Sequence, residues 1–495
     1  MKILFGLLAA CFLLSPCSAR PPGYPRSFLF QYDNVLGTSM ELKVFTASRS
    51  ASSRAEAAVL QEISRLSAIL SGYDANSEFS RWLRTQGTPV RVSPELYEVL
   101  ALFDQWRIMT DGALDASAEV VTRCWRQAAT RQCLPTNEEL AVAIAQVREQ
   151  HWRLDPANHT ATHLSTVPLM LNSFAKSYII KHAADAGLAA ASANAIVVNI
   201  GGDLVIAGNH TEEVLVSDPR SDAENDIPLD RLRLNNRAVA TSGSYRRGEL
   251  INGRWYSHIV DPRTGLPAGG VLSATVIAAN ATDAGALATA FNVMDTQESV
   301  KLAASLPGVD YLIITSDGRR LESPGWKQMG SPATSASQSA QPTADYELLV
   351  SLEISLQQGF AKRPYLAAWV EDENHAPVRT FALWHGPERY LPELRSWYLK
   401  YRGRYDADKS FAASVTSATR SAGKYTLKWD GKDDQGAPVK PGKYVVKIEV
   451  SREHGTYQLM RQELEWNDTP QKYTLNGNTE VAGLSLDYRK KTNEN

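Results

Sequence analysis

The stretch from Val239 to Thr289 holds the residue types and spacings best suited to catalysis. One signature, ATSGSYRR from Ala240, places Ser242 in a small-residue loop whose backbone N–H groups and hydroxyls could approach an anion such as a phosphate. A second, HIVDPRTG from His258, puts an imidazole and a carboxylate on a turn stiffened by Pro and Gly. Taken alone, the second signature is more typical of an ordinary hairpin turn.

Three other segments carry side chains that could serve a ligand. Tyr73 stands in a turn and could stack on a planar ring, or it could be a half-buried turn residue. Small residues between Thr110 and Asp115 would let the backbone approach a ligand closely. Lys176 lies near the start of a predicted helix, where a lysine is more often a solvated surface charge.

Eight short segments occur in the order found in the ApbE family, the FAD:protein FMN transferases of the bacterial envelope. They are LGTSM at Leu36, SGYDANSEFS at Ser71, TDGALD at Thr110, SFAKSYII at Ser173, NIGGDLVIAG at Asn199, ATSGSY at Ala240, HIVDPRTG at His258 and LATAF at Leu287. Each segment is weak alone, but together they make the chain between Val35 and Tyr311 resemble that family. The resemblance says nothing about the last third of the chain.

The resemblance implies a phosphoryl transfer. A Thr or Ser hydroxyl of an acceptor protein attacks the flavin-side phosphorus of FAD, so FMN becomes ester-linked to the acceptor and AMP is released. Such a reaction depends on positioning, on Mg²⁺ beside the pyrophosphate and on a base for the hydroxyl proton. The expected partners are therefore FAD as a substrate, Mg²⁺ and an acceptor flavoprotein of the envelope.

Carried over position by position, the resemblance assigns roles to individual residues. The catalytic residues are His258, which falls on the family's site histidine, and Lys176, close to phosphate. The expected cofactor contacts are Leu36, Tyr73, Ala113, Leu114, Asp115, Lys176 and Ile259, with Ser242 added from the anion-binding loop. The expected metal ligands are the Ser173 carbonyl and the Thr289 side chain, an oxygen set that suits Mg²⁺.

The sequence departs from the family pattern near these residues. The aspartate expected four residues before the metal-binding threonine is Gly285 here, and the aspartate before the lysine segment is Met170. The glycine after the lysine is Ser177, and the methionine that opens the first signature is Leu36. Two alternatives to the transferase stay open: an enzyme that hydrolyses FAD to FMN and AMP, and a non-catalytic flavin-binding or interaction protein.

Asp283 is the nearest carboxylate to the missing one, and we expect it to be the third metal ligand. The expectation holds if the helix starts near Ala284, because a loop residue can fold back toward Thr289. If Asp283 lay inside the helix, the six-residue separation would turn its side chain by about 240° around the helix axis from that of Thr289.

Two helices and two strands are expected to position these loops. Apolar residues recur at helical spacing from Ser52 to Leu70 and from Pro94 to Met109, while Ala195–Ile200 and Val271–Ala279 are strand-like. Between Val167 and Leu188, a strand-like start is expected to lead into a helix. Mixed strands and helices predict an α+β (mixed α/β) domain, and Gly201-Gly202-Asp203 is interpreted as a structural hairpin turn.

Composition limits the class of protein and its location. A chain of 495 residues with 43% hydrophobic residues can form two or three domains, and a net charge of −2 argues against a nucleic-acid partner. Met1–Ala19 is typical of a cleaved secretory signal, which predicts the periplasm or cell envelope of a bacterium. A lipid anchor at Cys11 is the competing interpretation, and no later segment has the roughly 20 apolar residues of a membrane-spanning helix.

Two cysteines, Cys124 and Cys133, would remain after signal cleavage. In an oxidising compartment they are expected to form a disulfide, although two unpaired thiols are the simpler alternative.

A change of composition at Gly330 divides the chain. Residues 330–345 are mostly Ser, Ala, Thr, Gln and Pro, which predicts a flexible linker. Beyond it, alternating apolar residues predict strands in an all-β, Ig-like sandwich without a catalytic constellation. The expected division is a signal peptide (1–19), an ApbE-like FAD-binding domain (20–329), the linker (330–345) and an accessory sandwich (346–495).

Overall fold

The structure is a computed structural model that describes most of the chain. It describes residues 26–221, 223, 225–226, 228–244, 247–330, 346–355, 363–386, 388–407, 415–417, 419–420, 422–452 and 455–491. The predicted signal and residues 331–345 of the predicted linker lie outside this range, so both stay predictions.

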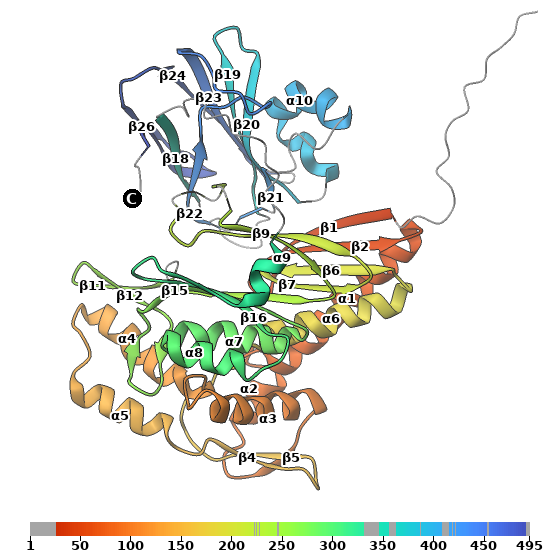
Figure 1. The fold of residues 1–495 in the computed structure, drawn as a ribbon, viewed down its shortest axis with the longest axis vertical. Helices are drawn as coiled ribbons and strands as arrows, with labels where there is room; N and C mark the ends of the chain where they lie inside the picture. The colour runs from red at the N-terminus through yellow and green to blue at the C-terminus, as the bar shows by residue number, and fades with distance from the viewer. Residues whose placement is uncertain are drawn as a thin grey trace, which may run out of the picture.

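An eight-stranded sheet organises the first part of the chain (Figure 1). Every neighbouring pair in it is antiparallel. In spatial order its strands are β1 (Arg26–Val35), β2 (Thr38–Thr46), β6 (Ala195–Ile200), β7 (Asp203–Gly208), β10 (Ala238–Gly243), β15 (Val271–Ala278), β16 (Asp310–Thr315) and β17 (Arg320–Glu322). The expected strands at 195–200 and 271–279 are confirmed.

Three helices cover one face of this sheet and form the main core with it: α1 (Arg49–Leu70), α6 (Ala175–Ala191) and α7 (Ala281–Val293). Helix α1 buries Val59, Ile63, Leu66 and Leu70, the residues whose spacing predicts it. The other face is covered by a hairpin of β8 (Thr211–Val216) and β9 (Asp230–Asn235) together with α9 (Pro324–Met329), whose Trp326 is buried in a second cluster.

The remaining elements of this part surround the helical face. They are α2 (Glu78–Leu83), β3 (Pro89–Arg91), α3 (Pro94–Met109), the 3-10 helix η1 (Ala116–Ala118), α4 (Glu119–Arg131), α5 (Asn137–Val147), β4 (Trp152–Asp155), β5 (Thr160–His163), β11 (Gly248–Ile251), β12 (Arg254–Ser257), β13 (Val260–Asp261), β14 (Leu266–Pro267) and α8 (Thr296–Ala304). Helix α3 has the predicted bounds because Ser93 caps it and Pro94 occupies its first position.

The second part of the chain is a sandwich of two sheets. One sheet has the order β22 (Gly423–Trp429), β18 (Tyr346–Ile354), β26 (Val481–Lys490) and β25 (Gln471–Asn476). The other has the order β21 (Thr416–Ser417), β20 (Pro377–Trp384), β19 (Tyr365–Asp372), β23 (Gly442–Ser451) and β24 (Tyr457–Trp466). Their facing residues form one apolar core, which confirms the predicted sandwich.

A helical cap on the sandwich was not predicted from the sequence. The 3-10 helix η2 (Glu388–Glu393) and α10 (Arg395–Ala407) pack on the outer face of the five-stranded sheet. Trp397, Tyr401 and Tyr405 recur every four residues and are all buried there. That aromatic spacing is the helical signal in the sequence.

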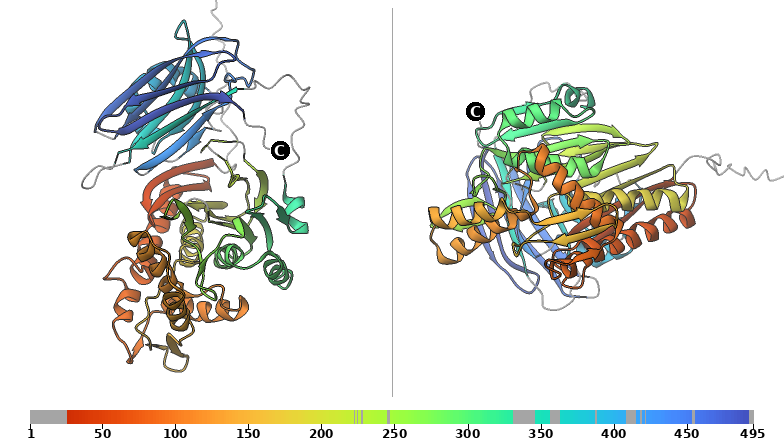
Figure 2. Two further views of the ribbon diagram at one scale, coloured as in Figure 1. Left: turned by 90° about the vertical axis from the view of Figure 1, so that its left-hand side faces the viewer. Right: turned by 90° about the horizontal axis from the view of Figure 1, so that it is seen from below.

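The sandwich lies on the side of the eight-stranded sheet opposite α7 and α8, as Figures 1 and 2 both show. Asn225 joins the two parts, because its side-chain amide donates to the carbonyls of Phe381 and Lys428 at 2.7 Å each. Its side-chain oxygen accepts from the Lys428 N–H, also at 2.7 Å, and Asp226 pairs with the Lys428 ammonium. These contacts fix the edge of β22 against the first part.

Two sequence expectations are wrong. Cys124 and Cys133 are both free, because helix α4 continues to Arg131 and extends the chain by about 1.5 Å per residue between them. Residues 167–171 bury every second side chain but form no strand, since no neighbouring strand pairs with them. None of the described helices offers an apolar stretch of the length that a membrane span requires.

Candidate functional site

Two tight turns at the ends of neighbouring strands of the sheet meet the start of helix α6. Leu36 and Gly37 form the turn between β1 and β2, and Leu36 has a φ of 50°, which is uncommon for a branched side chain. Gly201 in the β6–β7 turn lies against Thr38, where a Cβ would come within 2.6 Å of a Thr38 methyl. The first and fifth signatures therefore form one corner.

Lys176 and Asp203 form an ion pair in this corner. The Lys176 Nζ lies 3.0 Å from an Asp203 carboxylate oxygen, and the Ser177 hydroxyl donates to the same oxygen at 3.1 Å. Asp203 follows the two glycines interpreted above as a structural turn. They do form a hairpin turn, but the turn also delivers a buried carboxylate to the lysine.

Ser173 and Thr289 lie together where α6 begins beside α7. The Thr289 hydroxyl donates to the Ser173 carbonyl at 3.0 Å, so the two predicted metal ligands are adjacent. Farther along α7, the Asn292 amide donates to the Ser242 carbonyl at 3.1 Å, which ties the end of β10 to the same helix face.

Asp283 does not meet the condition set for it as a metal ligand. Helix α7 begins at Ala281 because the Asn280 side chain caps it by accepting from the Thr282 N–H at 2.9 Å. Asp283 therefore lies inside the first turn and is rotated by about 240° from Thr289. Burial raises its pKa. This corrects the expectation that Asp283 replaces the missing carboxylate.

Tyr73 stands beside the segment that leads into Ser173. The residue is 81% exposed, and its hydroxyl accepts from the Asn172 amide at 2.7 Å. The Met170 sulfur lies 2.7 Å from where a Cβ on Gly72 would stand, so Met170 packs against the Tyr73 turn. The methionine at this departure from the family pattern therefore has a packing role.

The loop from Thr110 to Asp115 is held rigidly. Asp111 and Gly112 both have positive φ, and the N–H groups of Ala113 and Leu114 donate to the Thr110 carbonyl and hydroxyl. Asp115 is buried, pairs with Arg107 at 2.8 Å and accepts from Ser117. Ala113 and Leu114 are also buried, so the part of this loop that faces solvent is Asp111 and Gly112.

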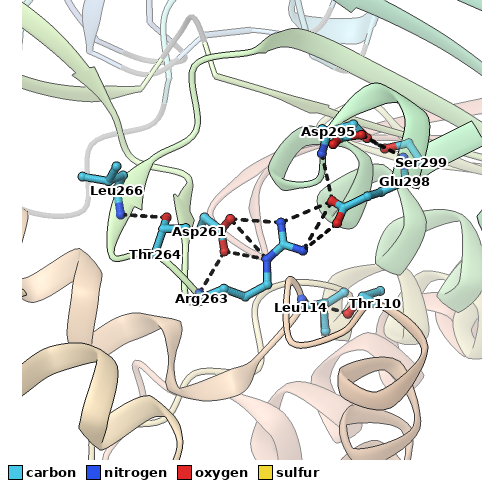
Figure 3. A network of polar contacts seen from close by, with 9 residues as sticks. All are labelled: Thr110, Leu114, Asp261, Arg263, Thr264, Leu266, Asp295, Glu298 and Ser299. Carbon is cyan, nitrogen blue, oxygen red and sulfur yellow. Dashed lines mark hydrogen bonds and ion pairs between the residues drawn. The ribbon is translucent and has the colours of Figure 1, made fainter. Parts of the chain in front are cut away.

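Arg263 links this loop to the one that carries His258 (Figure 3). Its guanidinium pairs with Asp261 at 3.0 Å and with Glu298 of α8 at 3.3 Å. Its side-chain carbon lies 3.6 Å from where a Cβ on Gly112 would stand. The two ion pairs therefore fix the turn between β13 and β14 to α8, and the Arg263 side-chain stem lies against Gly112 of the other loop.

His258 is the residue best prepared to accept a proton. Its Nδ1 lies 2.9 Å from the Arg247 carbonyl, which can only accept, so this nitrogen carries the hydrogen and Nε2 has the free lone pair. Although the residue is exposed, loss of water around the ring lowers its pKa. The hydrogen bond to the Arg247 carbonyl opposes this shift, and the nearby Arg247 charge adds to it. The ring is therefore neutral at neutral pH.

Ser242 and its neighbours form the end of a strand rather than an open anion loop. Ser242 pairs with Ala274 and Gly243 with Ser273 in the β10–β15 ladder. The Ser244 hydroxyl and N–H donate to the carbonyls of Val271 and Leu272 at 2.7 and 2.9 Å. Strand pairing therefore leaves the Ser242 side chain as the available polar group. Tyr245 and Arg246 lie outside the described residues.

Two adjacent hollows open beside these loops. One of about 300 Å³ is lined by Arg107, Asp111, Gly112, Asp115, Val147, Arg148, Pro262 and Arg263. The other, of about 700 Å³, lies along the end of α3 and β4 and contains none of the predicted site residues. Its size therefore does not identify the reaction site, whereas the smaller hollow borders two of the signatures.

Two oxygen donors of the kind that bind a divalent cation lie side by side at Thr289. The Ser173 carbonyl and the Thr289 hydroxyl are oxygen donors of the kind that Mg²⁺ prefers. No cluster of three or more His, Cys, Asp or Glu side chains suited to a metal occurs among the described residues. The two oxygens therefore suit one part of an Mg²⁺ coordination shell. A carboxylate and substrate oxygens would complete that shell.

Sequence reasoning missed three neighbours of the predicted site residues: the Arg247 carbonyl that fixes the His258 ring, the Asp203 carboxylate on Lys176, and the Arg263 network. The Arg263 turn could have been found, because D-P-R within a turn favours a local Asp–Arg pair. The other two depend on tertiary contacts. No hydrogen bond or ion pair within the described ranges joins His258 directly to another predicted site residue.

Both parts of the chain are similar to known protein families. Residues 36–313 match the ApbE family, and residues 347–483 match a family described as predicted periplasmic protein (DUF2271). The chain is 28% identical over 333 residues to the FAD:protein FMN transferase of Haemophilus influenzae, covering 64% of this chain and 94% of that protein. It is 31% identical over 257 residues to that of Treponema pallidum, covering 48% and 70%.

A solved structure supports the same fold. The crystal structure of the ApbE protein of Thermotoga maritima is 30% identical, with a TM-score of 0.55, and the match covers 62% of this chain and all of that one.

Proposed function

The chain belongs to the ApbE family, and we propose that it is an FAD:protein FMN transferase. A Thr or Ser hydroxyl oxygen of an acceptor protein forms a bond to the flavin-side phosphorus of FAD. The bond from that phosphorus to the bridging oxygen breaks, and AMP leaves with this oxygen. The hydroxyl proton is taken by a base on the enzyme, so the products are an FMN ester of the acceptor and AMP.

The orientation of His258 is the observation that carries this proposal. Its Nδ1 is tied to the Arg247 carbonyl, and its lowered pKa keeps Nε2 free to accept a proton at neutral pH. A histidine that is fixed through one nitrogen and free at the other suits a general base. His258 is thus the proposed acceptor of the hydroxyl proton.

Charge stabilisation falls to groups around the start of α6. Lys176, already partly exposed beside Asp203, is the proposed partner of the FAD phosphates. The Ser173 carbonyl and the Thr289 hydroxyl would hold Mg²⁺. When bound, the ion neutralises charge on the pyrophosphate oxygens.

The flavin and its ribityl chain are proposed to lie along the loops described above. Tyr73 offers an exposed ring for stacking, since only its hydroxyl is engaged. The turn at Leu36, the backbone of Ala113, Leu114 and Asp115, the Ile259 segment and the Ser242 hydroxyl complete the proposed set of contacts.

Hydrolysis of FAD to FMN and AMP is a second candidate reaction, and the exposure of His258 to solvent favours it. His258 is open to solvent, so water could replace the acceptor hydroxyl in the same step. The proton would still pass to His258. Only the acceptor of FMN distinguishes the two reactions.

The proposed compartment is the periplasm or envelope of a bacterium. The match of residues 347–483 to a predicted periplasmic family supports it, and so does the secretory signal predicted at Met1–Ala19. The acceptor would then be an exported protein. The sandwich would serve as an accessory module beside the transferase.

The test is to incubate the purified protein with FAD, Mg²⁺ and a Thr-containing acceptor flavoprotein in its unmodified form. Chromatography measures AMP and free FMN, while mass spectrometry measures FMN on the acceptor. The transferase predicts AMP together with modified acceptor, and the hydrolase predicts AMP together with free FMN. Flavin binding without AMP would contradict both and leave the non-catalytic alternative.

A further inference from the structure

The hairpin of β11 and β12 joins two of the signatures, since ATSGSY ends shortly before it and His258 follows its last residue. Its strands turn at Asn252 and Gly253, which both have positive φ, as a tight two-residue hairpin requires. At its base, the His258 N–H donates to the Arg247 carbonyl at 3.2 Å, and the same carbonyl holds the ring at Nδ1. The hairpin therefore sets the position of the proposed base.

One face of the hairpin is anchored on helix α4, which lies beside it in Figure 1. Ile251 is buried, and the Tyr256 ring centre lies 4.9 Å from that of Trp125 in the helix. Gln132, which ends the helix, donates to the Leu250 carbonyl at 2.9 Å and accepts from an N–H of the hairpin turn at 3.0 Å. These contacts hold the hairpin in one position.

The opposite face of the hairpin is apolar and uncovered. Leu250 and Trp255 are direct cross-strand partners, so their side chains share this face, and they are 56% and 48% exposed. A Cβ on Gly248 would stand 2.8 Å from the Trp255 ring, so the indole leans over Gly248 toward the base of the hairpin. Trp255 is three residues, or about 10 Å along a strand, from His258. An exposed apolar pair therefore lies close to the proposed base.

The outer edge of β12 also offers an unpaired backbone position. Bonded and non-bonded residue pairs alternate along an antiparallel ladder. Arg247 and His258 are a bonded pair, so Leu250 and Trp255 are a non-bonded one, and the Trp255 N–H and C=O point away from β11. The Leu250 carbonyl points outward to Gln132 in the same way. The Trp255 N–H and C=O have no hydrogen-bond partner in the part of the chain that the structure describes.

These features favour a protein segment over a small molecule as the occupant. Neither of the two hollows described above is lined by a residue of the hairpin, whereas small ligands bind in hollows. An exposed apolar face suits a protein partner, and a free strand edge pairs with an extended backbone. The nearest group with a proposed chemical role is His258, whose proton donor in the reaction is a hydroxyl of the acceptor protein.

We propose that the exposed face and outer edge of the β11–β12 hairpin dock the acceptor protein, through an extended segment next to its target Thr or Ser. This inference rests on the proposed function, because the acceptor is the partner whose hydroxyl must reach His258. The segment bonds through its backbone to Trp255 and lays an apolar side chain on the Leu250–Trp255 face. The hydroxyl residue that adjoins this segment then lies at His258.

The experiment uses the full chain, FAD, Mg²⁺ and a flavoprotein that carries FMN on a Thr, produced in its unmodified form. Mass spectrometry measures initial rates of FMN attachment over a range of acceptor concentrations, and flavin fluorescence measures FAD binding. Trp255→Ala should lower kcat/KM for the acceptor by about 10- to 30-fold, a loss typical of an interfacial tryptophan. A saturating acceptor concentration should restore the natural rate, because docking is lost and the chemistry is not. FAD affinity should not change.

A pair of leucine variants provides the matched comparison. Leu250→Ala should lower kcat/KM for the acceptor by about 3- to 10-fold, since it removes the smaller side chain of the docking face. Leu215→Ala is the control, because Leu215 is similarly exposed on the β8–β9 hairpin, and it should keep the natural value. Circular dichroism should be the same for all three variants.

Four results separate the alternatives. An unchanged kcat/KM for the acceptor in Trp255→Ala would overturn the inference. An equal loss of FAD affinity would overturn it by assigning the face to FAD, and a dimer in sedimentation velocity that Trp255→Ala dissociates would assign the face to a second copy of the chain. A lower kcat with an unchanged KM would show that Trp255 only positions His258. Absence of FMN attachment by the natural chain would instead contradict the proposed function.

Discussion

Charged side chains are used differently in the two parts of this molecule. In the sandwich, Glu371 is fully buried and receives Lys400 at 2.9 Å, Lys447 at 2.6 Å and the Trp369 indole N–H at 2.8 Å. Burial acts to raise its pKa, but the hydrogen bonds from both lysines outweigh it and leave the pKa below its usual range. The Glu371 carboxylate therefore has its partners inside the fold.

In the first part of the chain, two predicted site residues are held in place but remain open to solvent on one side. The His258 ring is engaged through one nitrogen, and Lys176 is one-third exposed although it is paired. The contrast teaches that titratable groups alone do not mark a site. A better indicator of a site is a group that is fixed in position but has a free hydrogen-bonding atom, because that atom can still bind a ligand or accept a proton.

The largest expected effect is on catalysis in the first part. His258→Ala should lower the rate of AMP formation from FAD by about 10²- to 10⁴-fold, since it removes the proposed general base. The stability should change little because the residue is exposed. His375→Ala in the sandwich, another exposed histidine, is the control and should keep the full rate. An undiminished rate in His258→Ala would remove this residue from the mechanism.

A substitution in the sandwich should lower the stability of the protein and leave catalysis intact. Glu371→Gln should cost about 3 kcal/mol of unfolding free energy, because it leaves two lysines without their buried partner. AMP formation should persist at temperatures where the variant stays folded. Urea unfolding measures the loss, with Glu353→Gln as the exposed control, since its Lys424 partner is 4.0 Å away. Equal stability of both variants would contradict the distinction between the two parts.

Asn225 couples the two parts and offers a way to separate them. Asn225→Ala removes three hydrogen bonds to the sandwich and should cost about 1–3 kcal/mol. Scanning calorimetry should then show two transitions farther apart than in the natural chain. The exposed Asn235→Ala, whose bond to Thr211 is long, should leave the trace unchanged. A trace that also stays unchanged in Asn225→Ala would show that other contacts hold the parts together.

The smallest expected effect is a pH dependence of stability. Burial lowers the pKa of His151 and His163, so the folded chain takes up these protons less readily than the unfolded chain. The stability should be unaffected above the unfolded value of 6.5 and should fall below it, by at most about 1.4 kcal/mol per pH unit for each histidine. Urea unfolding between pH 7.5 and 5.5 measures this. A profile that is equally steep in His163→Gln would exclude His163 as a cause.

Local pattern was sufficient to predict much of the fold. The apolar spacing and caps predict α1 and α3, and alternation predicts the strands of the sandwich, because these elements bury one face each. Residues 167–171 alternate too, yet a strand also needs a neighbour to pair with, which a single segment does not reveal.

The site was less predictable, because its key contacts join distant segments. Asn280 marks the start of α7, and recognising it as a cap would have excluded Asp283 from the metal site. Asp203 meets Lys176 only through the β6–β7 turn, and Gly285 lies against Ser177 only because α6 packs against α7. These are tertiary juxtapositions that periodicity does not encode.

The most direct test of the central claim is the stoichiometry of one reaction. The protein, FAD, Mg²⁺ and an unmodified acceptor flavoprotein are mixed, and AMP released is compared with FMN bound covalently to the acceptor. The account predicts one AMP for each FMN attached, with the FMN phosphate esterified to a Thr or Ser. AMP without attached FMN, or no AMP from a chain that binds FAD, would contradict it.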